Sequence, residues 1–540
     1  MSATMSAWML AGGILASLAL TIFGLFTLFT WLVFRKGEPV WSFLGSVLGS
    51  VKQAVSSNPD VRSLVDKRPA LSRFLTRRFS REDIYGWPTT LLFLAFLYVF
   101  LLFMGSIEDF VTKGVILSAD VRIANLLYSF RSPDLTDIFL WVTLLGKWYI
   151  VAGVVLTTTA LLLLRAMNGY AAGLWLSVSG SVLFTQLGKV AFHRPRPSVA
   201  AYLETTYSFP SGHASIALGL YGYLIYLLWR SSWGWRRKIL LSSLGMTAIL
   251  AIGFSRIYLG VHYLSDVWSG YLLGALWLII GVSVGVILED RWKGRTLVAM
   301  EQRKFFQPVY IGCILLLAAY YGVSGLLYHP PRIRPPDLPR VVLEGNILDA
   351  IKKEKVPRFT ETVTGAHQEP ISFIIMVRNE TSLIEAFSLS RWYRAVPEGI
   401  NSLVLAGRAA FFNIGDSTAP MSPSFWNGKP HGFGFQKPLP GVGLRERHHA
   451  RFWKTHYVDS GDRNIFFGPA SLDTGMKWII PHLIGPDIDT ERDFLFRDLL
   501  ASGQVESWSK EPFTDPGMGW NFNGDPFFSD GNVYVIRLRD

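Results

Sequence analysis

The stretch Ser255-Arg-Ile-Tyr-Leu-Gly-Val-His-Tyr-Leu-Ser-Asp266 joins two apolar runs, near 239–256 and 266–288. Each run is long enough to cross a bilayer as a helix. Arg256 ends the first run, and His262 and Asp266 lie four residues apart at the start of the second. That spacing places both side chains on one helical face, where Asp266 can orient the imidazole and leave its other nitrogen basic. An ionisable pair here indicates a functional site, with a purely structural His–Asp pair as the alternative.

Six further apolar runs accompany these two, near 7–34, 88–107, 139–164, 170–192, 212–229 and 307–328. We therefore expect about eight spans, with a six-helix core forming an all-α transmembrane bundle. The run near 139–164 contains Gly146-Lys-Trp148, so its membrane part should begin after them. Residues 1–36 predict a retained transmembrane helix, because no basic residue precedes the apolar run and Arg35-Lys36 follow it.

The composition is that of a membrane protein with a soluble part. Of the 540 residues, 50% are hydrophobic and only 17% are charged. A net charge of +12 raises the possibility of nucleic-acid binding, but the basic residues of the first half cluster in short loops between apolar runs. We therefore expect a bilayer and no nucleic acid as partner. The single cysteine, Cys313, excludes an intrachain disulfide and a cysteine metal site.

Loop charges predict the topology. Segment 35–87 carries ten Lys and Arg against five acids, and loops 230–238 and 289–306 are also basic, so these should be cytoplasmic. Segment 108–138 carries five acids against three basic residues and should lie outside. With eight alternating spans, the segment 255–266 and two further polar segments then share the outer face.

The first of these segments is Lys189-Val-Ala-Phe-His-Arg-Pro-Arg-Pro197. Its two prolines prevent the preceding apolar helix from continuing, so Arg194 and Arg196 should be displayed on a loop above the membrane. Arginine presents a planar fork that matches two phosphate oxygens, and Lys189 adds a point charge. The alternative is that these cations only snorkel at the membrane edge.

The second segment is Pro210-Ser-Gly-His213, at the start of the run 212–229. Ser211 is a natural N-cap, and Gly212 lets the backbone approach a ligand. A helix N-terminus binds anions, and His213 could reach an anion bound there. A plain helix cap beside an interfacial histidine is the alternative.

Together the three segments supply cations, backbone N–H groups, two imidazoles and one carboxylate, which suits transfer of a phosphate through a phosphohistidine. The chain resembles the type 2 phosphatidic acid phosphatase family, membrane lipid phosphatases related to vanadium haloperoxidases. The family pattern Lys-x6-Arg-Pro, Pro-Ser-Gly-His and Ser-Arg-x5-His-x3-Asp is matched at Lys189, Arg196, Pro197, Pro210–His213, Ser255, Arg256, His262 and Asp266. The resemblance covers about residues 90–290.

The resemblance implies a role for each matched residue. His262 would be the nucleophile, Asp266 would orient it, and His213 would protonate the leaving oxygen. The phosphoryl oxygens would be neutralised by Lys189, Arg196, Ser211, Arg256 and the Gly212 backbone N–H, with no metal or other cofactor. For His193 and Arg194 we favour local packing and solvation over binding of a second phosphate.

The C-terminal part has a different character. A Pro-rich linker (329–344) leads into residues 345–540, whose short mixed runs, such as 372–377 and 533–538, predict a mixed α+β soluble domain outside the membrane. Stretches 445–453, 468–475 and 482–493 resemble the LssY C-terminal family. A metal or an anionic sugar or headgroup could bind at the polar residues His448, His449, His482, Asp487 and Asp489, but ordinary strand and turn chemistry is the favoured interpretation.

We thus expect five parts, namely a helix (1–36), a basic cytoplasmic segment (37–87), a membrane phosphatase domain (88–328), a linker (329–344) and an LssY-like domain (345–540). The expected activity is metal-independent hydrolysis of a lipid phosphate or pyrophosphate, such as phosphatidate, phosphatidylglycerophosphate or polyprenyl (undecaprenyl) pyrophosphate. The site and the C-terminal domain would face the periplasm or exterior of a bacterial inner membrane. Phosphoryl transfer to an acceptor, a non-catalytic scaffold and, less so, a haloperoxidase remain as alternatives.

Overall fold

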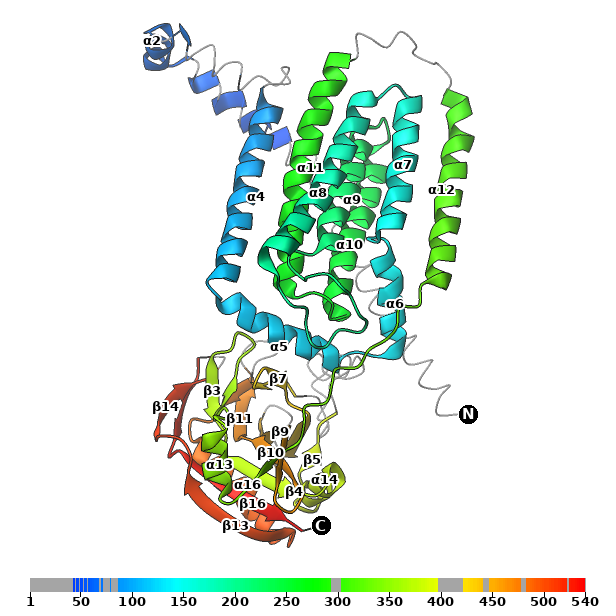
Figure 1. Cartoon of the computed structure of the whole chain (residues 1–540). Coiled ribbons are helices and arrows are strands. Elements are labelled where there is room, and N and C mark those ends of the chain that lie inside the picture. Colours follow the sequence, from blue (N-terminus) through cyan, green and yellow to red (C-terminus); the bar gives the residue numbers. More distant parts are fainter. Residues whose placement is uncertain are drawn as a thin grey trace. The chain divides into compact units, whose positions relative to one another are not determined.

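The computed structural model describes residues 86–292, 303–396, 421–439, 446–476, 482–521 and 524–539, together with parts of 42–78. The chain divides into two compact units (Figure 1). A membrane unit comprises Met1–Val111 and Pro133–Ile333, and a C-terminal unit comprises Thr112–Ser132 and Arg334–Asp540. The expected span near 7–34 lies outside the described residues.

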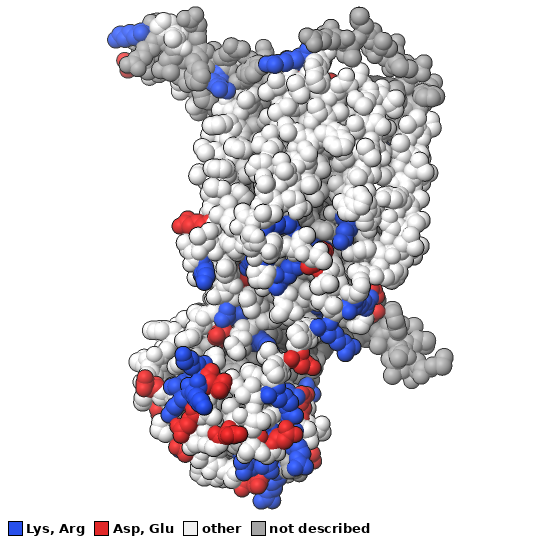
Figure 2. Space-filling model, in the orientation of Figure 1, with Lys and Arg blue, Asp and Glu red and all other residues white. Residues whose placement is uncertain are grey.

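Long helices make up the membrane unit, as the apolar runs predict. They are α4 (Trp87–Val111), α6 (Pro133–Leu144), α7 (Trp148–Leu164), α8 (Asn168–Phe192), α9 (Gly212–Arg230), α10 (Trp235–Tyr258), α11 (Leu264–Trp292) and α12 (Arg303–Leu327), preceded by the short α2 (Pro59–Lys67). Helix α7 begins at Trp148, after the Gly146-Lys147 break that the sequence indicates. The face of the bundle seen in Figure 2 carries almost no charged side chain between its ends.

Six helical segments in the described part of the chain are long and apolar enough to cross a membrane: Trp87–Val111, Pro133–Leu164, Gly212–Arg230, Trp235–Tyr258, Leu264–Trp292 and Pro308–Leu327. Helix α8 is 25 residues long but is not among these six. The predicted all-α transmembrane bundle is therefore confirmed, whereas the count of eight spans stays a prediction.

Small residues let α8, α9 and α11 pack backbone to backbone. A Cβ built on Gly274 of α11 would lie 2.3 Å from the backbone oxygen of Ser215 on α9. One turn further along α9, the Ser177 hydroxyl of α8 donates to the backbone oxygen of Gly219 at 2.9 Å. Without a hydrophobic drive between helices in lipid, such close contacts and interhelical hydrogen bonds hold a bundle together. They also fix how the polar ends of these helices meet.

The C-terminal unit is built on a ten-stranded mixed sheet, which confirms the predicted α+β class. Its main path runs β12-β11-β9-β10-β4-β16-β13, with β1 and β8 also paired to β9 and β5 paired to β8. These strands are β1 (Val341–Leu343), β4 (Phe373–Val377), β5 (Tyr393–Arg394), β8 (Phe433–Pro438), β9 (Glu446–Asp459), β10 (Asn464–Gly468), β11 (Ala470–Met476), β12 (His482–Ile484), β13 (Val505–Pro512) and β16 (Asn532–Leu538). The predicted runs 372–377 and 533–538 form β4 and β16, which pair in parallel with Ile374 beside Val535.

Alternating side chains give the sheet two buried faces. On one face, Phe373 and Ile375 of β4 pack with Leu383 of α14 (Glu380–Leu389) and Leu495 of α16 (Ile488–Ala501). On the other face, Ile374 packs in a cluster that contains residues of α13 (Ile347–Lys353). A second sheet, in the order β3-β2-β6-β7, and the pair β14–β15 complete the unit. Their strands are β2 (Phe359–Glu361), β3 (His367–Pro370), β6 (Phe425–Trp426), β7 (Lys429–Pro430), β14 (Gly517–Trp520) and β15 (Pro526–Ser529).

One helix groups differently from the sequence expectation. Residues 88–328 are expected to form one membrane domain, but α5 (Val115–Ser129), which follows α4 in the chain, groups with the C-terminal unit. Arg122 of α5 donates to Glu361 of β2 at 2.8 Å, and Asn125 donates to the backbone oxygen of Gly428 at 2.8 Å. These contacts join residues more than 200 positions apart in the sequence, so no local sequence pattern predicts them.

We predict that Gly274→Ala destabilises the bundle by about 1–3 kcal/mol, because the new methyl group has to displace backbone of α9. The thermal unfolding midpoint of the detergent-solubilised protein measures the effect. Gly312→Ala on α12 is the matched control, since a Cβ there meets nothing within 4 Å. An unchanged midpoint in Gly274→Ala would show that α9 and α11 do not pack this closely.

Candidate active site

The three polar segments of the membrane unit meet at one place. The first follows α8, which ends at Phe192 with His193 in the left-handed conformation, before Pro195. The second caps α9, and the third joins α10 to α11. Arg194 of the first segment donates to Asp266 of the third at 2.6 Å, and the backbone N–H of Ser211 in the second donates to the backbone oxygen of Asp266 at 2.9 Å.

The imidazole of His262 lies between a carboxylate and a guanidinium. Its Nδ1 is 3.4 Å from Oδ2 of Asp266, four residues on, and its Nε2 is 3.3 Å from Nη1 of Arg196. A proton on Nδ1 would face Asp266 and leave the lone pair of Nε2 directed toward the cations. Burial, with Arg196 and Arg256 nearby, lowers the pKa of His262 well below its ordinary value, so the ring is neutral near pH 7.

Asp266 has no exposed surface, and a partner holds each of its oxygens. Oδ1 accepts from Arg194, and Oδ2 accepts from the backbone N–H of Tyr263 at 2.9 Å. Arg194 is itself buried, with 7% of its surface exposed. The expectation that Arg194 is partly solvated was therefore wrong, because its charge neutralises the carboxylate that faces His262.

The second segment contributes two unpartnered polar atoms. Ser211 occupies the N-cap of α9 as predicted, but its side chain makes no capping bond. Its buried hydroxyl and the buried Nε2 of His213 have no hydrogen-bond partner within the described residues. His213 interacts electrostatically with Arg256, Lys147 and His262. Two unsatisfied buried groups beside cations are what a site for a polar ligand requires.

Two of the predicted cations converge on one loop. Lys189, near the end of α8, donates from Nζ to Oγ1 of Thr206 at 2.9 Å and to the backbone oxygen of Tyr207 at 2.8 Å. Arg196 donates from Nε to the backbone oxygen of Thr206 at 2.7 Å and from Nη2 to its hydroxyl at 3.0 Å. The structure thus brings the ammonium and the guanidinium to the same hydroxyl, next to His262.

The third predicted cation, Arg256, is almost wholly buried. It donates to the hydroxyl of Thr143 at 2.8 Å, to that of Tyr202, and to Oε1 of Glu204 at 3.0 Å. Lys147 lies 3.5 Å from the same Glu204 oxygen. Burial raises the pKa of Glu204, but the nearby Arg256, Lys147 and Arg196 outweigh it and lower the value to about 2.

The assembled site carries an excess of positive charge. It holds the cations Lys147, Lys189, Arg194, Arg196 and Arg256 against the carboxylates Glu204 and Asp266. A neutral imidazole amid buried cations suits attack on a bound anionic electrophile such as a phosphoryl group. The same cations would hold its oxygens.

Sequence reasoning missed two members of this site. Lys147 was noted only as an interruption of an apolar run, and Glu204 was not considered. Glu204 is the sole acid between the first and second segments, residues 193–212, and an acid alone among cations is a signal that could have identified it. Lys147 offered no comparable signal, because its partner lies on a distant loop.

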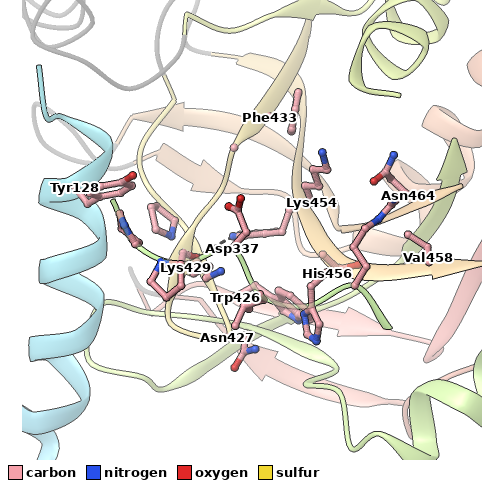
Figure 3. A pocket seen from close by; sticks show the side chains of 18 of the residues that line it. Tyr128, Asp337, Trp426, Asn427, Lys429, Phe433, Lys454, His456, Val458 and Asn464 are labelled. Carbon is pink, nitrogen blue, oxygen red and sulfur yellow. Dashed lines mark hydrogen bonds between the residues drawn. The ribbon is translucent and has the colours of Figure 1, made fainter. Parts of the chain in front are cut away.

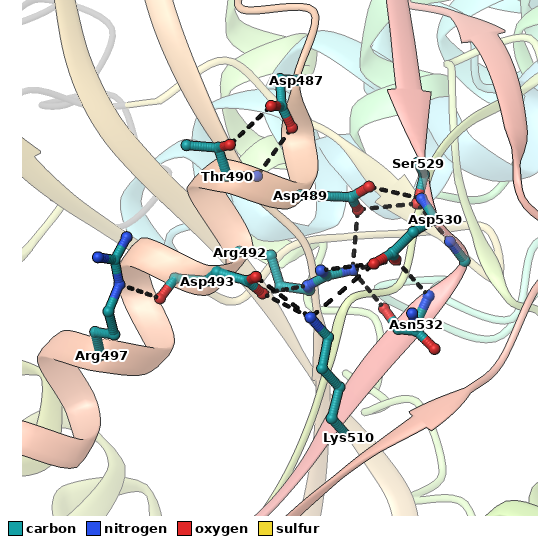
Figure 4. Close-up of polar contacts among 11 residues, drawn as sticks. Asp487, Asp489, Thr490, Arg492, Asp493, Arg497, Lys510, Ser529, Asp530 and Asn532 are labelled. Atoms are coloured by element: carbon teal, nitrogen blue, oxygen red, sulfur yellow. Dashed lines mark hydrogen bonds and ion pairs between the residues drawn. The ribbon is translucent and has the colours of Figure 1, made fainter.

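The polar residues singled out in the C-terminal domain are mostly paired. His448 contacts Glu491 at 2.8 Å, and His449 lies 3.2 Å from Asp473. Asp487 caps α16, and Asp489 accepts from Arg492 at 2.9 Å within the ion-pair network of Figure 4. The side chain of His482 lies outside the described residues. Within the described part of the chain no group of three or more His, Cys, Asp or Glu side chains that could hold a metal ion occurs.

Comparisons with known proteins agree with this division. Residues 170–286 match the family model of the PAP2 superfamily, and residues 353–533 match that of the LssY C-terminus. The chain is similar to phosphatidylglycerophosphatase B of Bacillus subtilis (strain 168), with 29% identity over 185 residues, 33% of this chain and 88% of that relative. It is also similar to the undecaprenyl-diphosphatase of Sulfolobus acidocaldarius, with 26% identity over 207 residues, 37% of this chain and 91% of the relative.

Among solved structures, the chain is similar to the first transmembrane PAP2 type phosphatidylglycerolphosphate phosphatase from Bacillus subtilis. The sequence identity is 24%, and the match covers 37% of this chain and 98% of that chain, with a TM-score of 0.34.

We predict that Glu204→Gln destabilises the protein by about 3 kcal/mol at pH 7, because the folded-state pKa of Glu204 is about 2 against an ordinary value of 4.5. A lowered carboxyl pKa contributes stability above the unfolded value, and this contribution is lost as the pH falls toward 2. The difference in the free energy of unfolding between the parent protein and Glu204→Gln should therefore disappear between about pH 5 and pH 2. Unfolding followed by tryptophan fluorescence across that range checks this, and a gap independent of pH would contradict it.

Arg194→Ala should cost about 3–5 kcal/mol of stability, since it leaves the fully buried carboxylate of Asp266 without its cation. Thermal unfolding in detergent measures the loss. Arg230→Ala, which removes an exposed arginine at the end of α9, is the matched control and should change little. Equal midpoints for the two variants would mean that Arg194 does not neutralise Asp266.

Proposed function

Because the membrane unit contains a PAP2 superfamily domain and the C-terminal unit an LssY C-terminus domain, we propose that this integral membrane protein hydrolyses a lipid phosphate or lipid diphosphate. The main support for the proposal is the cluster of charged and polar side chains around His262. It joins a neutral, oriented imidazole to the half-buried Arg196 and the buried Lys189 and Arg256. All the matched positions from Lys189 to Asp266 fall within the PAP2 match.

The first step forms a phosphohistidine. The lone pair of His262 Nε2 attacks phosphorus, the bond to the leaving oxygen breaks, and His213 gives that oxygen a proton. The Nδ1 proton stays directed at Asp266, whose charge stabilises the imidazolium that develops. Lys189, Arg196 and Arg256 neutralise the phosphoryl oxygens, with the Ser211 hydroxyl and the Gly212 N–H as further donors.

The second step returns the enzyme to its starting state. Water attacks the phosphorus, His213 accepts the proton of that water, and the bond to Nε2 of His262 breaks. The products of the two steps are the dephosphorylated lipid and inorganic phosphate. For a diphosphate substrate, the first leaving group is the lipid monophosphate.

The cations make catalysis without a divalent metal the simplest mechanism. Arg196 lies 3.3 Å from the attacking nitrogen and Arg256 lies beside Glu204, so positive charge already stands where a transferring phosphoryl group would need it. A phosphate entering the site would compete with Glu204 for Arg256. Glu204 therefore acts, in this proposal, as the group that positions Arg256 before substrate binds.

The lipid substrate and the membrane face are further parts of the proposal. One relative is named for phosphatidylglycerophosphate and the other for undecaprenyl diphosphate, which supports a phospholipid phosphate or a polyprenyl diphosphate as substrate. The loop charges support a site at the outer face of a bacterial inner membrane, with the LssY-like domain on the same side.

We predict that His262→Asn abolishes release of inorganic phosphate from a panel of lipid phosphates in EDTA, with a loss of at least about a thousandfold. His193→Asn is the matched control, since His193 is exposed and its left-handed backbone suits asparagine. The control should retain activity. A strict requirement for divalent metal would overturn the mechanism, and a phosphorylated acceptor in place of free phosphate would identify a transferase.

A further inference from the structure

A cavity of about 900 Å³ lies within the C-terminal unit (Figure 3). Its wall combines the linker 335–340, the hairpin formed by β6 and β7, strand β9 and Tyr128 of α5. This volume falls within the range of small-molecule sites. Trp453 and Phe433 are among the lining residues, and both are largely buried.

The tip of the hairpin is held rigidly by its backbone. Gly428 donates its N–H to Glu361 at 3.0 Å, and its carbonyl accepts from Asn125 of α5 at 2.8 Å. The carbonyl of Lys429 accepts from the indole N–H of Trp453 at 3.0 Å. Asn427 and Gly428 both have positive φ, as a two-residue hairpin turn requires. The backbone is thus fixed, while the side chains of Asn427 and Lys429 are left exposed.

Some charged side chains around the cavity form ion pairs with other residues, and others do not. Arg340 pairs with Asp462 at 3.1 Å, and Lys454 pairs with Glu380 at 2.9 Å. Lys429, by contrast, has no hydrogen bond or ion pair from its side chain within the described residues, and neither has the carboxylate of Asp337. The cavity therefore offers the ammonium of Lys429, the carboxylate of Asp337 and the amide of Asn427.

We propose that this cavity binds a phosphorylated sugar or polyol, with Lys429 on the phosphate and Asp337 and Asn427 on the hydroxyl groups. Hydroxyl groups donate to carboxylates and accept from amides, so Asp337 and Asn427 suit a polyol. A single unpaired ammonium suits one phosphate.

A purely apolar ligand suits the cavity less well, because it would leave both Asp337 and Lys429 desolvated without partners. The phosphorylated polyol can come from a soluble sugar phosphate or from the headgroup of an inositol lipid. Because residues of the C-terminal unit alone line the cavity, this inference does not depend on the proposed hydrolysis.

The test uses the full chain in nanodiscs with the His262→Asn substitution, so that a phosphate ester is not turned over. Calorimetric titration with glucose 1-phosphate probes the soluble source. The same titration in nanodiscs with and without phosphatidylinositol shows whether this lipid competes with glucose 1-phosphate, and so probes the lipid source. Lys429→Ala should weaken binding at least about tenfold, whereas Lys429→Arg should retain it. Lys353→Ala, which removes an exposed lysine of α13 outside the cavity, should bind like the parent. Glucose, which lacks the phosphate, should bind at least about tenfold more weakly.

Three results would overturn the inference. They are equal affinity in Lys429→Ala and Lys353→Ala, binding of neither probe, and a loss of binding in Arg196→Ala alone, which would place the ligand in the membrane unit. Failure here is distinct from failure of the proposed function, because Lys429→Ala in the otherwise unchanged chain should release phosphate from lipid at the parent rate.

Discussion

A carboxylate with no exposed surface, Asp266, ties the polar part of the membrane unit together. Its side chain binds Arg194 and faces His262, and its backbone oxygen accepts from Ser211. A charge buried this deeply is tolerated only when its partners are fixed, since breaking such a pair costs several kcal/mol. The requirement to satisfy Asp266 therefore holds the loops after α8 and α10 and the start of α9 in a single arrangement.

The helices beneath make that arrangement possible. Gly274 brings α11 against the backbone of α9, and Ser177 bonds α8 to α9. If larger residues separated these helices, the loops above them would not meet. The cations gathered there repel one another, and Glu204 offsets part of that repulsion beside Arg256 and Lys147. A site of this kind stores positive charge that an incoming phosphate can neutralise.

The C-terminal unit is also held together by buried side chains and ion pairs. Its sheet buries apolar side chains on both faces, and ion pairs such as Arg492 with Asp530 fasten α16 to the turn before β16. The stretches that resemble the LssY family lie largely in this framework. The cavity is formed partly by segments outside these stretches, namely the linker and the β6–β7 hairpin, together with β9 and Tyr128 of α5.

The sequence by itself determined the membrane bundle, the three polar segments and the α+β class of the C-terminal part. Hydropathy runs, prolines after helices and the His-x3-Asp spacing are local patterns, and local backbone geometry follows from them. Only the tertiary structure decided that Arg194 neutralises Asp266 and that Glu204 lies close to both Lys147 and Arg256. It also decided that α5 forms a hydrogen bond with a hairpin about 300 residues further along the chain. These contacts arise from packing between distant segments, where burial forces each charge to find a partner that no short-range pattern specifies.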